Sequence, residues 1–354
     1  MFDLNKLIRK NIKELTPYSS ARDDFKGKAG IFLDANENSL GSAVPAQKLN
    51  RYPDPLQSEV KKKIGKLKGL HPENIFIGNG SDEAIDILIR TFCNPAKDSI
   101  LIMPPTYGMY EVAAQINDTG VVKVNLKTGF KLNYKEIRRA ANKHVKLIFV
   151  CSPNNPTGTI TRLSDIEALL KMFPGIVVVD EAYIDFADSP SALMLLNRYP
   201  NLAVLQTFSK AWGLAGLRVG MAFASPAIVN TMNKIKAPYN VGELPQRIIL
   251  QALHNSNKVQ SMVAKIKSER ALLVKELSRL PLIKEIIPSE ANFLLVKTEH
   301  HASLYNYLSE AGVVVRNRSA APLCAGGLRI TVGTPRENKK LISLLKSYKL
   351  NKAA

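Results

Sequence analysis

Residues 206–220, QTFSKAWGLAGLRVG, carry the most informative pattern in this sequence. The apolar run up to Thr207 predicts a buried strand that ends just before Ser209 and Lys210. Arg218 follows in the same stretch, and its charged fork suits a phosphate. A lysine beside such a phosphate grip is typical of one whose amine forms a Schiff base. Taken alone, the lysine is also consistent with a solvated surface charge, so the interpretation depends on the rest of the chain.

Composition indicates a soluble globular protein with more than one core. The chain has 354 residues, of which 45% are hydrophobic and 22% charged, and this length accommodates one large and one smaller domain. No apolar run approaches the ~18 residues that a membrane helix needs, so we expect no membrane partner. Residues 1–15 place apolar side chains at helical spacing with charges between them, which predicts an amphipathic helix rather than a secretory signal.

The cysteine content and the net charge limit the cellular compartment and the classes of binding partner. Cys93, Cys151 and Cys324 are odd in number and far apart, so we expect a reduced, cytoplasmic protein without a metal site. The net charge of +19 suits either nucleic acid or the steering of anionic small molecules. The lysines are scattered, and the one dense run, at 61–68, is typical of a solvated helix face. We therefore favour small anions and expect no nucleic-acid partner.

Strands and helices alternate along the first part of the chain. Uninterrupted apolar runs predict strands at 75–77, 100–103, 147–151, 176–179 and 202–207, with helical segments between them. Such runs are typical of strands buried on both faces of a mostly parallel sheet flanked by helices. The sequence therefore predicts an α/β fold for this part.

The pattern changes near residues 238–245. A long helical stretch at 246–280 is followed by predicted strands at 293–296, 313–315 and 328–332 and a closing helix. We predict three parts: an N-terminal helix and arm (1–45) that packs on the small domain or a partner subunit, a large domain (46–245) and a smaller C-terminal α/β domain (246–354).

Polar or glycine residues follow each predicted strand of the large domain. They are Gly80 and Ser81, Tyr107, Asn155, Asp180 and Tyr183, and Ser209 and Lys210. Ligands of open parallel sheets bind beyond the carboxyl ends of the strands, where these residues are expected to meet. The sequence therefore predicts one binding site at this edge of the sheet.

The segment Gly78–Asp82 is expected to bind a phosphate. Its glycines allow a close backbone approach, and the following helix supplies amide donors and the positive end of its dipole. A dinucleotide fingerprint needs a further glycine where Glu83 stands, and the segment has no Walker lysine. A tight turn capped by Ser81 remains the structural alternative.

Asp180, at the end of a valine run, is either a helix cap or a buried functional acid. A buried carboxylate is costly unless it is paired, and a protonated pyridine nitrogen would be a suitable partner. Tyr183 and Asn155 could then reach the phenolic oxygen of the same ring, and Tyr107 offers an aromatic face for stacking. Lys210 would act as the Schiff-base lysine and as the base that transfers protons.

These motifs carry a resemblance that spans almost the whole chain. The sequence resembles the fold type I aminotransferases that depend on pyridoxal 5'-phosphate (PLP), and within them the histidinol-phosphate aminotransferase branch. The resemblance in fold and cofactor is carried by the motifs SPNNPTG, VVVDEAYIDF and TFSKAWGLAGLRVG. The resemblance to this branch is carried by IFLDANEN, RYPDP and LRITVGT. PYSSARDDFKG, IGNGSDEAIDILIR, PPTYGMY and SEANFLLV match as well. The resemblance implies a large domain with a mostly parallel sheet and a smaller α/β domain.

The resemblance also implies residue roles. Lys210 forms the Schiff base, Asp180 pairs with the pyridine nitrogen, Asn155 and Tyr183 contact the phenolic oxygen, and Tyr107 stacks on the ring. The cofactor phosphate is bound by Gly80, Ser81, Asp82, Ser209 and Arg218, and by Tyr52 from the other subunit of a homodimer. Arg329 receives the anionic group of the substrate, and Arg316, Tyr18 and Asn36 help to read the substrate phosphate. One position departs from the pattern: Ser39 stands where the family commonly has proline.

The implied reaction is a transamination in histidine biosynthesis. L-histidinol phosphate and 2-oxoglutarate would give imidazole acetol phosphate and glutamate. Two alternatives keep the cofactor, namely an aromatic amino-acid aminotransferase and an L-threonine O-phosphate decarboxylase of cobalamin synthesis. A third is a basic nucleic-acid-binding protein that retains the fold.

Overall fold

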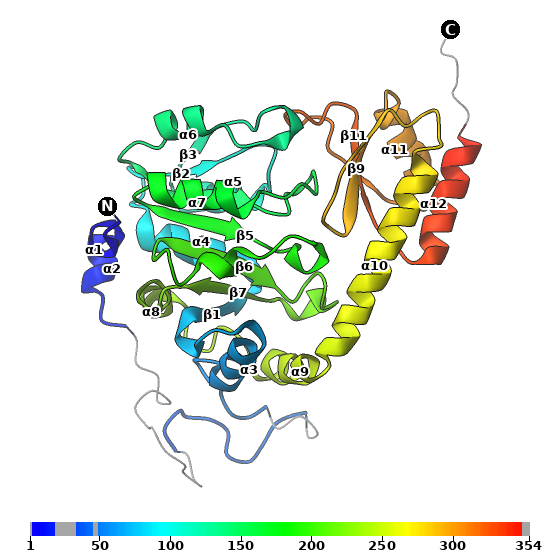
Figure 1. The fold of residues 1–354 in the computed structure, drawn as a ribbon. Helices are drawn as coiled ribbons and strands as arrows, with labels where there is room; N and C mark the ends of the chain where they lie inside the picture. Colours follow the sequence, from blue (N-terminus) through cyan, green and yellow to red (C-terminus); the bar gives the residue numbers. More distant parts are fainter. Residues whose placement is uncertain (1, 18–32, 45–48, 349–354) are drawn as a thin grey trace.

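The computed structural model describes residues 2–17, 33–44 and 49–348. Its larger part is a seven-stranded sheet with helices on both faces (Figure 1). The strands are β1 (Ile75–Asn79), β2 (Ser99–Ile102), β3 (Gly120–Lys123), β4 (Val145–Cys151), β5 (Ile176–Asp180), β6 (Leu202–Thr207) and β7 (Val219–Ala224). Their order is β1-β7-β6-β5-β4-β2-β3.

Only β7 runs against the direction of its neighbours. It pairs antiparallel with both β1 and β6, whereas the pairs from β6 across to β3 are parallel. The sheet is therefore mostly parallel, as predicted. One consequence positions the site: the start of β7 lies at the same edge as the carboxyl ends of the other six strands.

Both faces of this sheet are covered, because successive side chains of a strand point to opposite faces. Val177 and Val179 of β5 belong to a core shared with α3 (Ser58–Lys68), α7 (Leu163–Met172) and α9 (Glu243–His254). Ile176 and Val178 belong to a second core, shared with α4 (Gly80–Phe92), α5 (Met109–Ile116) and α8 (Pro226–Ile235). Every side chain of β5 is buried, which confirms the inference from the apolar runs.

The remaining large-domain elements are short. They are α6 (Tyr134–Ala140) and the 3-10 turns Pro72–Asn74, Thr128–Phe130, Ile184–Phe186, Ala192–Leu195 and Ala215–Leu217. No helix among the described residues is long and apolar enough to cross a membrane.

The smaller domain has a four-stranded antiparallel sheet of order β10-β11-β9-β8. Its elements are α10 (Ser256–Leu277), β8 (Glu285–Ile287), β9 (Phe293–Lys297), α11 (His301–Glu310), β10 (Arg316–Asn317), β11 (Gly327–Thr331) and α12 (Pro335–Ser347). Leu328 and Ile330 of β11 pack into a core with α10, α11 and α12. Arg329 lies between them in sequence, so its side chain points to the opposite face, toward the large domain.

Three details of this part differ from the prediction. The helical stretch 246–280 is two helices, because Asn255 adopts a non-helical conformation between α9 and α10, and asparagine competes with helical hydrogen bonds. The strand expected at 313–315 pairs only from Arg316 onward, where it meets Arg329. Strand β8 was not predicted, because three residues are too few for a clear periodicity.

The N-terminal segment forms two short helices, α1 (Leu4–Leu7) and α2 (Lys10–Glu14). They dock on the large domain, where the Arg9 amide donates to the Thr91 carbonyl at 3.1 Å and the Arg9 guanidinium to the Arg90 carbonyl at 2.8 Å. Figure 1 places them at the side of the molecule opposite the small domain. The expectation that this segment packs on the small domain is therefore wrong for α1 and α2. The buried core of the large domain, against which Leu4 and Leu7 pack, supplies the apolar surface instead.

Candidate active site

A cavity of about 120 Å³ lies at the carboxyl edge of the large sheet. Its lining residues are Gly80, Ser81, Asp82, Tyr107, Cys151, Asn155, Asp180, Ala182, Tyr183, Thr207, Ser209, Lys210 and Arg218. The structure thus brings together every predicted cofactor-binding residue except Tyr52. They come from the ends of β1, β4, β5 and β6, from the loop after β2 and from the residue before β7.

One end of the cavity is built from the start of α4. Helix α4 begins at Gly80 without a side-chain cap, so its first amide groups need an external acceptor, and Ser81 does not act as the cap considered above. Gly80 has φ +75°, and a Cβ there would lie 2.9 Å from Arg218 Nη2. A Cβ on Gly220 would lie 2.2 Å from the Ser81 nitrogen. Gly80 therefore leaves room for the Arg218 guanidinium, and Gly220 lets β7 pack directly against the start of α4.

Arg218 reaches this end of the cavity from the start of β7. Its backbone has φ +54°, a left-handed conformation that is strained for a residue with a side chain. Its guanidinium lies 3.4 Å from the Asp82 carboxylate, which also accepts a hydrogen bond from the Tyr107 hydroxyl at 3.2 Å. The antiparallel direction of β7 is what puts this arginine beside the start of α4.

Lys210 stands in the loop after β6. Its Nζ lies 5.6 Å from the ring centre of Tyr183. Burial, and next the positive charge of Arg329, lower the pKa of the lysine amine below its ordinary value. A larger share of the amine is therefore unprotonated at neutral pH, which suits both a nucleophile and a proton acceptor.

Asp180 closes the other end of the cavity. Only 2% of its surface is exposed, and it accepts hydrogen bonds from the Tyr110 hydroxyl at 2.6 Å and the Ala182 amide at 3.1 Å. Burial raises the pKa of this carboxyl. It forms no salt bridge with a described residue, so a cationic N–H donor would complete its environment.

Sequence reasoning missed Tyr110, although the second tyrosine of PPTYGMY marks it. Tyr110 is fully buried and stacks on Phe149, with 4.7 Å between ring centres. Its hydroxyl is held against Asp180 by this packing. Tyr110 lies in the first turn of α5, with its ring centre 5.5 Å from that of Tyr107, and its nearness in sequence to Tyr107 is the signal that could have found it.

Asn155 joins the two domains. Its side-chain amide donates to the Tyr183 hydroxyl at 3.5 Å, and its carbonyl oxygen accepts a hydrogen bond from the Arg329 guanidinium. Arg329 also lies over the Phe293 ring, 5.4 Å from its centre. The small domain thereby contributes an arginine directly beside the cavity.

The other predicted substrate residues are less close. Arg316 is exposed and pairs with Arg329 across the β10–β11 ladder. Asn36 is exposed and does not line the cavity, and Tyr18 lies outside the described residues. Tyr52 also stays away from the cavity of its own chain, where it stacks on Tyr239 with 4.5 Å between ring centres.

A family comparison fits this geometry. The family model of class I and II aminotransferases matches residues 29–345. The chain belongs to this aminotransferase family. A histidinol-phosphate aminotransferase of Cytophaga hutchinsonii is 54% identical over 347 residues, covering 98% of this chain and 99% of that protein. One of Parabacteroides distasonis is 50% identical and covers 99% of this chain and 100% of that protein.

A solved structure agrees with the fold. The histidinol-phosphate aminotransferase of Clostridium acetobutylicum superimposes with a TM-score of 0.79 at 25% identity, covering 85% of this chain and 91% of that one. The comparisons thus confirm the resemblance, the fold class and PLP as the cofactor of this aminotransferase.

The cavity of the aminotransferase fits PLP in three respects. The uncapped amides of α4 and the Arg218 guanidinium suit its phosphate. Asp180 is a buried carboxylate that needs a cationic donor, as the protonated ring nitrogen would be. Lys210 supplies an amine of lowered pKa for its carbonyl carbon.

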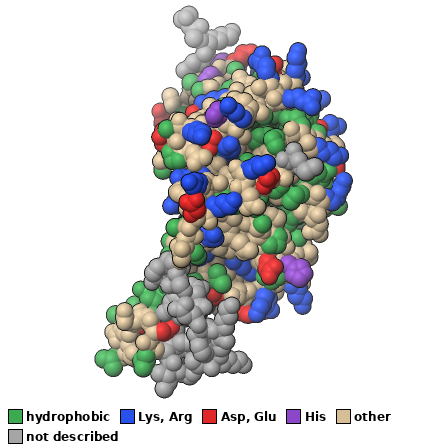
Figure 2. All heavy atoms as spheres, turned by 90° about the vertical axis from the view of Figure 1, so that its left-hand side faces the viewer, with side chains coloured by type: hydrophobic (Ala, Val, Ile, Leu, Met, Phe, Trp, Pro, Cys, Tyr) green, Lys and Arg blue, Asp and Glu red, His purple; other side chains and the backbone are tan. Residues whose placement is uncertain are grey.

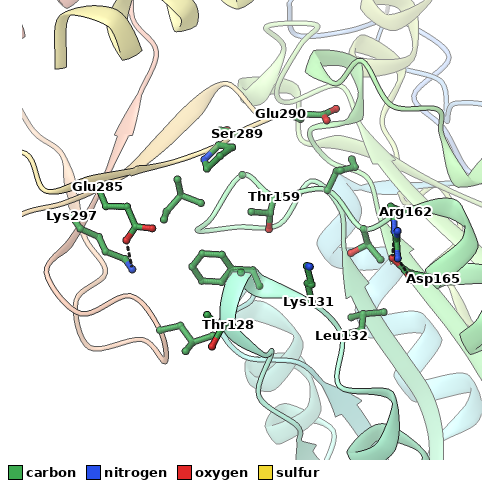
Figure 3. Close-up of a pocket in the computed structure, with 18 of the residues that line it drawn as sticks. Thr128, Lys131, Leu132, Thr159, Arg162, Asp165, Glu285, Ser289, Glu290 and Lys297 are labelled. Atoms are coloured by element: carbon green, nitrogen blue, oxygen red, sulfur yellow. Dashed lines mark hydrogen bonds and ion pairs between the residues drawn. The ribbon is translucent and has the colours of Figure 1, made fainter. Parts of the chain in front are cut away.

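A larger hollow of about 870 Å³ lies between the two domains of the aminotransferase. Figure 3 shows that its walls come from both domains. Its charged groups are largely paired, Arg162 with Asp165 at 2.9 Å and Lys297 with Glu285 at 2.8 Å. Gly158 and Thr159, from the loop that carries Asn155, line this hollow, whereas Asn155 itself does not. The side chains predicted for cofactor binding and catalysis line the smaller cavity instead.

Proposed function

We propose that this aminotransferase transfers the amino group of L-histidinol phosphate to 2-oxoglutarate, giving imidazole acetol phosphate and glutamate in histidine biosynthesis. The observation that carries the proposal is the arginine-bearing wall that the small domain adds beside the cofactor cavity. Arg329 contacts Asn155 there, and Arg316 stands opposite Arg329 in the sheet. Both substrates are anionic, and the two relatives described above are histidinol-phosphate aminotransferases that match this chain over 99% and 100% of their length.

Bound PLP supplies an electron-withdrawing ring that makes the hydrogen on the amine-bearing carbon of the substrate acidic. In this proposal, Asp180 holds a proton at the ring nitrogen, and Tyr110 and the Ala182 amide hold Asp180 in place. Tyr183 and Asn155 orient the phenolic oxygen. Lys210 Nζ takes the proton from the substrate carbon and returns it, because its lowered pKa makes the unprotonated, proton-accepting form of the amine easier to reach.

The end of the cavity that would bind the cofactor phosphate needs little rearrangement when PLP binds. Gly80, Ser81 and Asp82 offer the open start of α4, and Ser209 and Arg218 reach the same end. Tyr107 is fixed by its bond to Asp82, which supports a stacking role for its ring. Fixed donors of this kind bind a phosphate without reorganisation.

The excess positive charge is consistent with anionic substrates. On the face drawn in Figure 2, Lys and Arg side chains are scattered among uncharged and acidic ones rather than gathered in one patch. This distribution supports general steering of small anions over a defined nucleic-acid groove. The three cysteines are free and buried, which supports our further proposal that the enzyme works in the cytoplasm.

The direct test is the absorption spectrum of the purified protein loaded with PLP. We expect the band of the loaded enzyme to bleach when histidinol phosphate is added and to return with 2-oxoglutarate. Purified protein that does not develop this band when PLP is added would contradict the cofactor assignment. A band that responds to phenylalanine but not to histidinol phosphate would favour the aromatic alternative, and carbon dioxide from phosphothreonine the decarboxylase.

We also propose that the enzyme is a homodimer in which Tyr52 completes the partner's phosphate site. Tyr52 is half exposed and does not line its own cavity. Leu56, Leu244 and Ile248, in the loop before α3 and on α9, are exposed apolar side chains of the same region. Their exposure supports an interface there, because contiguous exposed apolar surface usually marks one.

A hybrid dimer tests this arrangement. Tyr52→Phe should weaken cofactor binding roughly tenfold or more, because a hydrogen bond to a charged phosphate is lost while the ring stack on Tyr239 stays. Chains carrying Tyr52→Phe and Lys210→Ala, co-expressed with different tags, should give a hybrid with one fully equipped site. That hybrid should bind PLP at PLP concentrations that are too low to load the Tyr52→Phe homodimer. A hybrid no better than the homodimer would place Tyr52 outside the partner's site.

We propose one change to the predicted domain boundary. Helix α9 packs on α3 of the large domain, whereas Leu273 and Leu277 of α10 belong to the small-domain core. These contacts favour a boundary at Asn255 rather than at residue 245.

A further inference from the structure

Three arginines share one face of the small-domain sheet. Arg316 lies opposite Arg329 in the antiparallel β10–β11 ladder. The ladder continues one step further, because the Arg318 amide donates to the Gly327 carbonyl at 2.8 Å. Residues two apart in an extended strand point to the same side, so Arg318 joins Arg316 and Arg329 on the face that looks toward the large domain.

This cluster is not neutralised by the protein. None of the three arginines forms a salt bridge with a carboxylate in the part of the chain that the structure describes. Burial and then the charges of Arg329 and Arg316 lower the pKa of Arg318, as expected for cations on one face of a sheet. Cations that share one face are unfavourable unless an anion joins them.

One N–H group of the Arg318 guanidinium has no hydrogen-bond partner among the described residues. The side chain is half-buried, and its Nε is buried without a hydrogen-bond partner among the described residues. A buried N–H without a partner costs free energy that a ligand oxygen would recover. Arg318 is also within electrostatic range of Tyr183, which lines the cofactor cavity.

We propose that Arg318 is a third anion-binding residue of the substrate site and that it makes the enzyme favour a phosphate dianion over a carboxylate. This inference rests on the proposed function. A phosphate ester carries close to two charges at neutral pH and three acceptor oxygens, whereas a carboxylate carries one charge and two oxygens. Arg329 with Arg316 can match the carboxylate of the second substrate. The third guanidinium has a full partner only when a phosphate is bound.

The test compares Arg318→Gln with Arg318→Lys in the PLP-loaded enzyme. Arg318→Gln removes the charge and the fork, and Arg318→Lys keeps the charge alone. Arg336→Gln is the matched control, because Arg336 is an exposed arginine of α12 in the same domain. Each protein is first checked for the cofactor band. Calorimetry then measures binding of inorganic phosphate and of acetate, and steady-state assays measure KM and kcat for each substrate.

We expect Arg318→Gln to weaken phosphate binding and raise the KM for histidinol phosphate by about 10- to 100-fold, the usual loss for a hydrogen bond to a charged group. Acetate binding, the KM for 2-oxoglutarate and kcat should change by less than about threefold, and Arg318→Lys should fall between the two. The loaded parent already holds the cofactor phosphate, so inorganic phosphate reports on the substrate site.

Three outcomes separate the claims. If the parent turns over histidinol phosphate and Arg318→Gln binds phosphate as the parent and Arg336→Gln do, the role of Arg318 is refuted. Equal losses for phosphate and acetate would refute the proposed preference for a dianion. If the parent itself does not turn over histidinol phosphate, the proposed function fails, whatever the variants do.

Discussion

Lys210→Ala should reduce turnover by a factor on the order of 10⁴ or more, the usual loss when the group that makes and breaks covalent bonds is removed. The lysine is the one amine that lines the cavity among the described residues. Its removal takes away both the covalent link to the cofactor and the base that moves the substrate proton. The phosphate end, built from Gly80, Ser81 and Arg218, stays intact, so the variant should still bind PLP.

Single-turnover absorption and steady-state assays check this expectation. The matched control is Lys61→Met, because Lys61 is also a buried lysine of lowered pKa, about 8, but lies on α3 outside the cavity. That variant should keep turnover near the parent's level. A small primary amine added to Lys210→Ala should restore part of the rate, because it can serve as the missing base. Full activity of Lys210→Ala without added amine would end the assignment.

The lowered pKa of Lys210 has a consequence for pH. Only the unprotonated amine attacks a carbonyl, so the rate at which the empty protein captures PLP should rise with pH while the lysine loses its proton. Because burial and Arg329 lower the pKa, this rise should level off below the ordinary lysine value of 10.5. Arg329→Gln removes one source of the shift and should move the plateau to higher pH.

Much of this site was predictable because a parallel sheet collects its strand ends. Once strands were assigned up to Val179 and Thr207, the residues after them had to meet at one edge. Arg218 was assigned to the phosphate from its charged fork and its nearness in sequence to Lys210, not from its place in the sheet. Nothing in the sequence shows that β7 turns antiparallel, and that turn is what brings Arg218 to the start of α4.

Contacts between distant segments were beyond prediction. The hydrogen bond from Tyr110 to Asp180 depends on how α5 lies against β5, and the contact between Arg329 and Asn155 depends on how the domains meet. Periodicity reports which face of an element is apolar, not which neighbour covers it. For the same reason, the amphipathic pattern of residues 1–15 predicted a docked helix but not the surface on which α1 and α2 dock.

Asp180→Asn is the second change with a large expected effect. It keeps the shape of the side chain but removes its charge and one of its two acceptor oxygens. Both oxygens already accept a hydrogen bond, from Tyr110 and from the Ala182 amide, so the amide leaves one donor without its partner. The proton on the ring nitrogen also loses its counter-charge. We expect turnover to fall on the order of 10²- to 10³-fold, as when a preorganised charge partner is lost.

Glu181→Gln is the matched control for this variant. Glu181 is the next residue and is equally buried, but it points away from the cavity and accepts hydrogen bonds from Ser191, Gln206 and the Ala192 amide. The change should cost about 1–3 kcal/mol of stability, because one of these donors loses its acceptor. It should leave turnover near the parent's level.

The two carboxylates also differ in what their pH dependence reports. Burial raises the pKa of Glu181 from 4.5 to about 7, so the folded protein binds more protons than the unfolded chain between these values. The contribution of Glu181 to stability should therefore decline as pH rises through that window, and the decline should be absent in Glu181→Gln. Thermal unfolding of both proteins across this pH range measures the difference.

For Asp180→Asn, the readout is the bound cofactor. If Asp180 keeps a proton on the ring nitrogen, its loss should change the pH at which the spectrum of the loaded enzyme shifts, and turnover should fall even when the site is saturated with PLP. If instead Asp180 only braces β5 against Tyr110, stability should fall while kcat at saturating PLP and the spectrum stay as in the parent. If Asp180 only stabilises the fold, saturating PLP should restore turnover in Asp180→Asn. If Asp180 supplies the counter-charge, saturating PLP should not restore turnover, because every bound ring still lacks its partner.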